Sequence, residues 1–235
     1  MGWLVGSLGP LNLSEAEGIR FLASLPLHGH PLKLHDSCAV VGSSNDLSGR
    51  ALGSEIDQHS LVVRINCAPT AGFEKDYGSK TDLRISSVGG ATHCAMPETD
   101  FMHRLCVTED VELLLKDSKL HGKKLSIFSS FFLTYLQSNF FDDSTASTHI
   151  STRILTVLWA LHSCQRVDTY GFTAGSSVER SAHQKYFIKE SAKHFPSKRD
   201  VQDSSRRKNP EHDWVAEYQL HERLERAGAL RRRHK

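Results

Sequence analysis

Residues 38–49, CAVVGSSNDLSG, place a short apolar run directly before a loop of small and polar residues. The run 38–41 is typical of a buried β-strand, and a helix is expected to follow at about 49–58. A strand, a small-residue loop and a helix N-terminus direct backbone N–H groups at one point, which suits a phosphate. The loop matches neither GxGxxG nor the Walker pattern, so an ordinary strand-to-helix turn is the alternative interpretation.

Apolar runs and amphipathic segments keep alternating along the rest of the chain. Strands are predicted at 38–41, 61–65, 83–86, 124–128 and 167–170. Helices are predicted at about 49–58, 109–118, 130–138, 151–164, 183–193 and 211–227. This alternation predicts an α/β fold, with a Rossmann-type, mostly parallel sheet flanked by helices. Residues 1–35 are expected to be an irregular N-terminal segment with one helix over 14–25, and residues 36–235 a single domain.

The composition is that of an ordinary globular protein, with 39% hydrophobic and 24% charged residues in a chain of 235. Lys and Arg (29) nearly balance Asp and Glu (27), so the global charge gives no indication of a nucleic-acid partner. The run RRRHK at 231–235 is a local exception, and we predict that it is a solvated tail. No stretch approaches the roughly 18 apolar residues that cross a bilayer, and residues 1–13 lack the basic region of a signal peptide.

The chain has five cysteines, which are too few for a fold built on disulfides, and none of them forms a CxxC pair. This spacing argues against zinc, so no metal site is expected. The odd count leaves at least one free thiol if the other cysteines pair internally. Composition alone does not define the redox compartment.

Ser151 begins a later helix whose residues 154–161 are almost wholly apolar. Serine is a good N-cap, so capping alone is a sufficient explanation for this residue. The first turn of the helix is also expected to face the crevice at the carboxyl ends of the strands, where α/β sheets bind ligands. The two roles are compatible.

His212 lies at a third candidate helix start. Asn209 and Pro210 fit the N-cap and N1 positions, which places His212 in the first turn of the helix. There the helix dipole disfavours protonation, and a neutral imidazole in a cleft is a competent general base. The chain has 14 histidines, so position alone does not single out this one. The apolar stripe that follows consists of Ala216, Leu220, Leu224 and Ala227.

Three segments resemble the sialylmotifs of the animal-type sialyltransferase family, glycosyltransferase family 29. Residues 38–86 resemble the large motif, residues 151–172 the small motif, and residues 212–231 the very small motif, in which His212 and Glu217 have the His-x4-Glu spacing. The resemblance implies a GT-A-like fold of the sialyltransferase variant, with CMP in the crevice at the carboxyl edge of the sheet. It also implies an inverting, metal-independent transfer of sialic acid from CMP-sialic acid to a glycan hydroxyl, with no further cofactor.

The resemblance assigns roles to individual residues. His212 would be the general base that takes the proton of the acceptor hydroxyl, and Asn66 would hold the donor nucleotide. Further contacts with the donor are implied for Ser43, Ser44, Ser151 and Thr152, although many members have Asn at the position of Ser43. The next position is usually Gly, which lets a backbone approach a ligand closely. Arg153 stands there instead, and it would either pair with the phosphate or carboxylate of the donor or obstruct the site.

The third motif of the family normally has a His-Tyr-Tyr-like run, and the nearest match here is AHQKY at 182–186. His183 is the candidate for stabilising the leaving phosphate, with a structural role as the alternative, and Tyr186 is a weaker candidate. Glu217 is expected to act in structure rather than chemistry. On a helix, its side chain would point about 140° away from that of His212.

The family joins a cysteine of the large motif to one of the small motif, and Cys38 and Cys164 occupy those positions. Closing such a long loop stabilises a fold by about 4 to 5 kcal/mol in the chain-entropy model. The bond needs an oxidising lumen, so the resemblance implies the secretory pathway and the Golgi. Members usually carry an N-terminal membrane anchor, and none is visible in this sequence, as expected for a truncated product or a soluble variant.

Two alternatives to a sialyltransferase remain open within the family. The same chemistry with CMP-Kdo or another CMP-activated ulosonic acid would use the same residues. A catalytically inactive member that binds a nucleotide or glycan would be consistent with Arg153 and the altered third motif. An unrelated nucleotide-binding α/β domain is the remaining interpretation.

Overall fold

The computed structural model describes residues 7–8, 35–87, 100–104, 124–128, 133, 136, 140, 150–172, 185–187, 212 and 214–233. The strands are β1 (Ser7–Leu8), β2 (His35–Val41), β3 (Leu61–Ile65), β4 (Leu83–Ser87), β5 (Asp100–Arg104), β6 (Lys124–Ile127), β7 (Cys164–Tyr170) and β8 (Arg231–Arg233). The helices are the 3-10 turn η1 (Asn45–Leu47), α2 (Gly53–Asp57), α3 (Glu74–Tyr77), α7 (Thr152–Ser163) and α9 (Trp214–Arg226).

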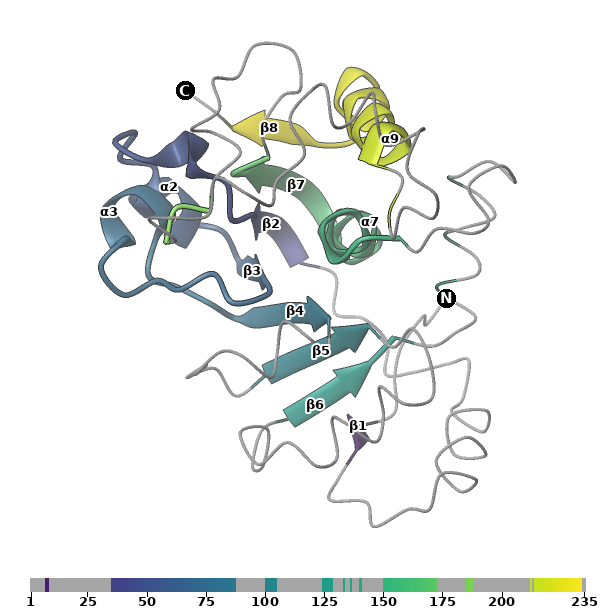
Figure 1. The fold of residues 1–235 in the computed structure, drawn as a ribbon, viewed down its shortest axis with the longest axis horizontal. Helices are drawn as coiled ribbons and strands as arrows, with labels where there is room; N and C mark the ends of the chain where they lie inside the picture. The colour runs from purple at the N-terminus through teal and green to yellow at the C-terminus, as the bar shows by residue number, and fades with distance from the viewer. Residues whose placement is uncertain are drawn as a thin grey trace.

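All of these strands belong to one eight-stranded sheet in the order β1-β6-β5-β4-β3-β2-β7-β8 (Figure 1). Every neighbouring pair from β6 to β8 runs parallel, and only β1 is antiparallel to its neighbour. In the centre, Val40 of β2 lies opposite Val63 of β3 on one side and Thr169 of β7 on the other. The prediction of an α/β fold with a mostly parallel sheet is therefore confirmed.

The five predicted strands are all present, with bounds that differ by a few residues. Three strands were not predicted. β5 has only two adjacent apolar residues, Phe101 and Met102, and β1 is a two-residue strand within the segment expected to be irregular. The third is β8, so the prediction that the C-terminal basic run is a solvated tail is wrong for 231–233. Its arginines pair with acidic side chains, as Arg231 does with Asp168 of β7 at 2.7 Å.

Of the predicted helix at 49–58, the structure has only the shorter α2, and the 3-10 turn η1 lies before it in the loop. Gly49 and Ala51 between them adopt positive φ angles of 79° and 54°, which a continuous right-handed helix does not allow. The helix at 151–164 is confirmed as α7. Of 183–193, residues 185–187 form a bridge and a turn rather than a helix. Residues 133 and 136 are helical as predicted, whereas 14–25 and 109–118 lie outside the described residues.

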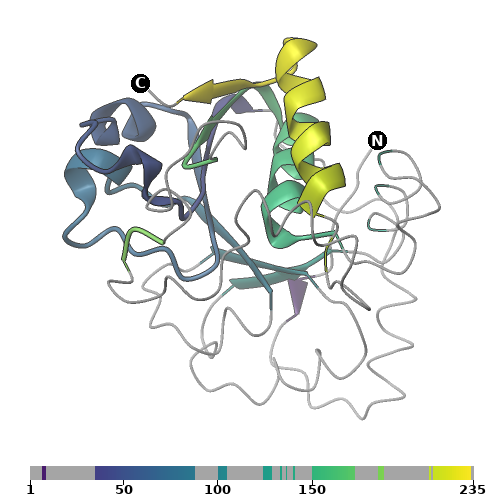
Figure 2. The same cartoon turned by 45° about the horizontal axis from the view of Figure 1, so that its top comes forward.

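The sheet has a different core on each face. Cys38 and Val40 of β2 pack in the cluster that contains α7 and Leu220 of α9, whereas Ala39 and Val41 pack with Ile56 of α2 on the opposite face. This alternation follows the period of two in a strand. Figure 2 shows α7 and α9 together, apart from α2 and α3. Along the predicted stripe of α9, Leu220 and Leu224 do pack in the core, but Ala227 is exposed beyond the helix end.

Candidate active site

The sheet changes direction of winding between β2 and β7, because β2 leads to β3 on one side and pairs with β7 on the other. Ligands of open α/β sheets bind outside the carboxyl ends of strands at such a switch point. Gly42 follows β2 and Gly171 follows β7, and their backbones touch. A Cβ atom on Gly42 would lie 2.5 Å from the carbonyl oxygen of Gly171, so only glycine fits there. We call this contact between Gly42 and Gly171 the floor of the candidate site.

Ser43 and Ser44, two predicted donor contacts, lie in the loop that leaves this floor. The backbone N–H of Tyr186 donates to the Ser43 carbonyl at 3.2 Å, and Ser44 forms an antiparallel bridge with Lys185. The Tyr77 hydroxyl donates to the Ser44 carbonyl at 2.9 Å. The structure thus brings part of the altered third motif onto the loop of the large motif. Binding of a donor by the two serines stays a prediction.

Tyr186 is anchored by aromatic contacts. Its ring stacks on Tyr77 with centroids 3.7 Å apart and meets the edge of Phe73 at 4.8 Å. Its hydroxyl donates to the carbonyl of Pro69, and burial raises the pKa of this hydroxyl to about 12. Tyr186 therefore remains protonated and serves here to position its segment. His183, the candidate for the leaving phosphate, lies outside the described residues.

Asn66 has an unusual backbone conformation directly after β3. Its φ angle is +50°, in the left-handed region that residues other than glycine seldom adopt. Its N–H donates to the Ile85 carbonyl at 2.9 Å, its carbonyl accepts from Arg84 at 2.6 Å, and its side-chain oxygen accepts from the Ser86 hydroxyl at 3.2 Å. A strained residue that is held so firmly is typical of a functional site.

Arg84 is a part of this arrangement that sequence reasoning missed. Its side chain is buried in the sheet, and it also donates to the carbonyl of Ala68 at 3.0 Å, so it holds both ends of the turn 66–68. The available signal was an arginine in the middle of a strand predicted to be buried, since a buried guanidinium must find acceptors.

Ser151 caps α7 as predicted, because its hydroxyl oxygen accepts from the backbone N–H of Ile154 at 3.3 Å. The buried carboxylate of Glu217 on α9 accepts the backbone N–H of Ser151 at 2.7 Å and its hydroxyl hydrogen at 2.5 Å. The structural role expected for Glu217 is confirmed: it links α9 to the first turn of α7. The Thr152 side chain is buried beside it. Donor contacts by Ser151 and Thr152 stay predictions.

His212 is half-buried and lies two residues before α9, which begins at Trp214. The prediction that it lies in the first turn of the helix is therefore wrong, and the angle of about 140° between it and Glu217 does not apply, since that angle requires both residues to be helical. The link between Glu217 and Ser151 joins α9, the helix that follows His212, to the start of α7. The role of His212 as general base stays a prediction.

Arg153, in the first turn of α7, lies beside the residue that follows the contact between Gly42 and Gly171. Its guanidinium lies 4.7 Å from the centroid of the Phe172 ring, and Phe172 follows the glycine at the end of β7. Burial lowers the pKa of Arg153, while the carboxylates of Glu217 and Asp46 act in the opposite direction. An arginine remains charged in such surroundings.

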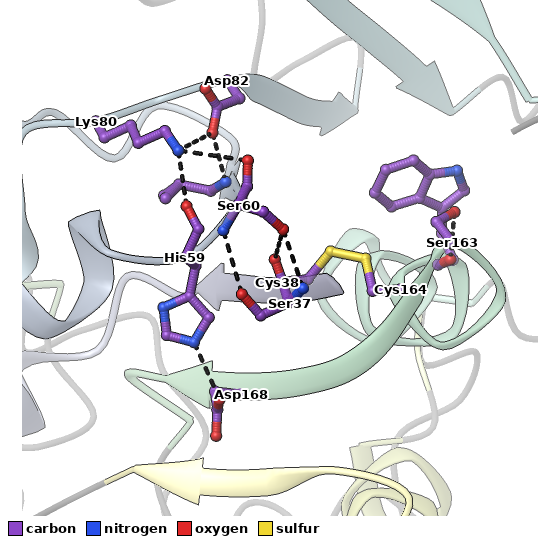
Figure 3. Close-up of a disulfide and its surroundings, with 11 residues drawn as sticks. Ser37, Cys38, His59, Ser60, Lys80, Asp82, Ser163, Cys164 and Asp168 are labelled. Atoms are coloured by element: carbon purple, nitrogen blue, oxygen red, sulfur yellow. Dashed lines mark hydrogen bonds and ion pairs between the residues drawn. A yellow bond between two sulfur atoms is a disulfide. The ribbon is translucent and has the colours of Figure 1, made fainter. Parts of the chain in front are cut away.

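A disulfide joins Cys38 and Cys164, as predicted, with their Cα atoms 6.0 Å apart across a separation of 126 residues. Figure 3 shows that it connects β2 to the first residue of β7, directly after α7. It therefore ties the large and small motifs together beneath the site. Cys67, directly after Asn66, is also disulfide-bonded.

The residues that the structure describes contain no group of three or more His, Cys, Asp and Glu side chains that could hold a metal ion. Among the same residues, none of the helices combines the length and the apolar character that crossing a membrane requires.

Comparison with known proteins gives one family. The model of glycosyltransferase family 29 (sialyltransferase) matches residues 21–119 and 99–229, most of the chain. The human CMP-N-acetylneuraminate-beta-galactosamide-alpha-2,3-sialyltransferase 1 is 34% identical over 163 residues, covering 59% of this chain and 45% of the relative. A human alpha-N-acetyl-neuraminyl-2,3-beta-galactosyl-1,3-N-acetyl-galactosaminide alpha-2,6-sialyltransferase is 28% identical over 198 residues, covering 74% and 64%. The chain therefore spans less than half the length of the first relative.

The fold is similar to a solved structure of a mammalian sialyltransferase. The two superpose with a TM-score of 0.70 over 94% of this chain and 79% of the other, at 24% sequence identity. A second structure, described as a mammalian sialyltransferase in complex with Gal-beta-1-3GalNAc-ortho-nitrophenol, gives a TM-score of 0.69 at 23% identity. These matches support the GT-A-like fold of the sialyltransferase variant.

Proposed function

Because the chain belongs to glycosyltransferase family 29, the sialyltransferase family, we propose that it transfers sialic acid from CMP-sialic acid to a glycan hydroxyl. The observation that carries this proposal is the geometry around Asn66. A left-handed asparagine, held by Arg84 and Ser86, stands beside the small-residue loop at the switch point of the sheet. This is where a nucleotide binds in an open α/β sheet.

The donor site would be built from three segments. The loop at Ser43 and Ser44 and the left-handed turn at Asn66 would hold CMP, and the first turn of α7 would face the sugar and its phosphate. The disulfide and the link between Glu217 and Ser151 support this assignment, because they fix these segments relative to one another. A fixed site loses less conformational entropy when the donor binds than a mobile one.

In the proposed reaction, His212 takes the proton of the acceptor hydroxyl as its oxygen attacks the anomeric carbon of the sugar. The bond between that carbon and the CMP phosphate oxygen breaks, and its electron pair leaves with the phosphate. Attack from the opposite face inverts the anomeric configuration. His183 would stabilise the phosphate as it leaves. Because CMP is a good leaving group, we propose that no metal ion is required.

The names of the relatives suggest the first acceptors to test. One relative is an alpha-2,3-sialyltransferase that acts on a beta-galactosamide, and a solved relative was studied with Gal-beta-1-3GalNAc-ortho-nitrophenol. We therefore propose a galactose-terminated glycan as acceptor. The disulfide between Cys38 and Cys164 favours an oxidising compartment, in agreement with a place in the secretory pathway and the Golgi lumen.

The test is a transfer assay with CMP-sialic acid and galactose-terminated glycans, with products identified by mass spectrometry. CMP-Kdo is assayed in parallel, and EDTA is added to one series to test metal independence. We expect sialylated product, and a loss of at least about a hundredfold in kcat for His212→Ala, with unchanged donor affinity. Transfer at the wild-type rate by this variant would show that His212 is not the base.

One specific observation favours a second candidate function. Arg153 replaces the usual glycine at the start of α7 and lies over Phe172 beside the proposed site. If the guanidinium obstructs the sugar, the protein is a nucleotide-binding member without transferase activity. Saturable binding of CMP without transfer from either donor, and without donor hydrolysis, would identify this function.

A further inference from the structure

We propose that Arg153 binds an oxyanion of the donor, and that Phe172 and His221 are the positioning residues that hold its guanidinium in the site. The oxyanion is the phosphate of CMP or the carboxylate of the sugar, which present the same chemistry to arginine. This inference rests on the proposed function, because it assumes that a CMP-activated sugar binds at the carboxyl edge of the sheet.

Arg153 is a half-buried residue whose guanidinium lies over the face of Phe172. Among the described residues, this guanidinium makes neither a hydrogen bond nor an ion pair. Other sheltered arginines differ: Arg64 donates to the carbonyls of Tyr77 and Lys80 at 2.9 Å. Five N–H groups that find no acceptor among the described residues are a binding capacity that an oxyanion, whether phosphate or carboxylate, can fill in a bidentate manner.

The contact with Phe172 places this capacity at the site. Phe172 directly follows the contact between Gly42 and Gly171, and its ring would lie 3.3 Å from a Cβ atom on Gly42. The guanidinium above this ring is therefore adjacent to the start of the loop that carries Ser43 and Ser44. Glu217 and Asp46 favour its charged form without forming an ion pair with it, so the cation remains available.

His221 supports Phe172 from within the core. The two rings stack with centroids 5.2 Å apart and an angle of 18° between their planes. Arg232 of β8 donates to Nδ1 of His221 at 2.9 Å, so Nε2 carries the hydrogen and donates to the Thr169 hydroxyl at 3.3 Å. Both ring nitrogens are thus occupied, and the orientation of the imidazole is fixed by two strands.

The imidazole of His221 can lie near both Arg153 and Arg232 because it is uncharged. Burial, together with the charges of Arg153 and Arg232, lowers the pKa of His221 to about 3. A neutral ring can lie near two guanidinium groups, whereas an imidazolium would repel both of them. The side chains Arg232, His221, Phe172 and Arg153 therefore form a continuous support that runs from β8 to the first turn of α7.

The experiment compares three ligands by isothermal titration calorimetry: cytidine, CMP and a non-transferable fluorinated analogue of CMP-sialic acid. With Arg153→Ala, we expect an affinity loss of about 10- to 100-fold for a ligand that carries the recognised oxyanion and no loss for cytidine. A loss that is already present with CMP identifies the phosphate. A loss that appears only with the sugar nucleotide identifies the carboxylate. Arg153→Lys should recover only part of the affinity, since it cannot bind in a bidentate manner.

His221→Gln and Phe172→Leu test the support. We expect a smaller loss for the same ligand, unchanged cytidine binding, and no further loss when either change is combined with Arg153→Ala. Equal losses for all three ligands would indicate a merely structural role and overturn the positioning. Binding of all three by Arg153→Ala within about twofold of wild type would overturn the inference while leaving the proposed function intact. Absence of binding by the wild-type protein would overturn both.

Discussion

Replacing Glu217 with glutamine tests the link that joins the helix after His212 to the small motif. The carboxylate accepts two hydrogens from Ser151, one from the backbone N–H and one from the hydroxyl, and it is 5% exposed. A glutamine amide has one acceptor oxygen, and its NH₂ group faces a donor. The serine hydroxyl can rotate to a new partner, but the backbone N–H cannot.

The size of the effect follows from these two bonds. A hydrogen bond to a charged group contributes about 1.5 to 3 kcal/mol, and a neutral one about 1 kcal/mol. Glutamine retains one neutral bond in place of two charged ones, so the free energy of unfolding should fall by about 2 to 5 kcal/mol. Glu217→Ala keeps neither bond and also leaves a cavity, so the free energy of unfolding should fall by at least as much.

Urea unfolding followed by far-ultraviolet circular dichroism measures this change, with the disulfides kept intact. The matched control is Glu222→Gln on the same helix, because Glu222 accepts one hydrogen bond from Tyr218 at a partly exposed position. The control should remain within about 0.5 kcal/mol of wild type. If Glu217→Gln unfolds at the same urea concentration as the control, with the same m-value, the link does not stabilise the fold and the reasoning is refuted.

Three further changes have expected outcomes. Replacing both Cys38 and Cys164 with alanine should lower the free energy of unfolding by about 4 to 5 kcal/mol in urea without reductant. When the pH falls from about 7.5 to 5, the free energy of unfolding of the wild type should decrease by about 2 kcal/mol more than that of His221→Gln. The reason is that the histidine binds a proton near pH 6.5 in the unfolded chain and only near pH 3 in the folded one. An equal decrease in both proteins would contradict this. Asn66→Ala and Asn66→Gly should both weaken CMP binding by about tenfold. Both variants lose the hydrogen bond with Ser86, but alanine should destabilise the fold more than glycine, since glycine tolerates the positive φ; equal melting temperatures of the two variants would contradict the backbone argument.

The central strand β3, which the sequence predicted, is buried on both faces. Four of its five residues, Leu61, Val62, Val63 and Ile65, are apolar because the sheet is covered on both sides there, and the fifth is the buried Arg64. β8 could not be predicted in this way, because its three residues are arginines. It forms a strand because the side chain of Arg231 meets the buried Asp168, 63 residues earlier in the chain. A local pattern of polarity does not contain such a pairing.

In the candidate site, too, some residues could be predicted from the sequence and others could not. The family motifs located Asn66 and Ser151, and they gave the disulfide pairing that the structure contains. They did not give Arg84 as the residue that holds Asn66, or the stack beneath Arg153, because these depend on side chains that meet only after the sheet has formed. The position of His212 before α9 was also missed, since helix starts are among the least certain features of sequence-based expectations.

The bond between Cys38 and Cys164 turns the intervening chain into a covalent ring. The ring contains the proposed donor contacts from Ser43 to Arg153, whereas His212 lies on the open arm that follows it. A protease that cuts once within 39–163 would leave two pieces joined through sulfur, which migrate as one species until a reductant is added. After a single cut between Cys164 and His212, no bond between Cys38 and Cys164 would hold the proposed base to the donor-binding part, so the two pieces would separate on denaturation without a reductant.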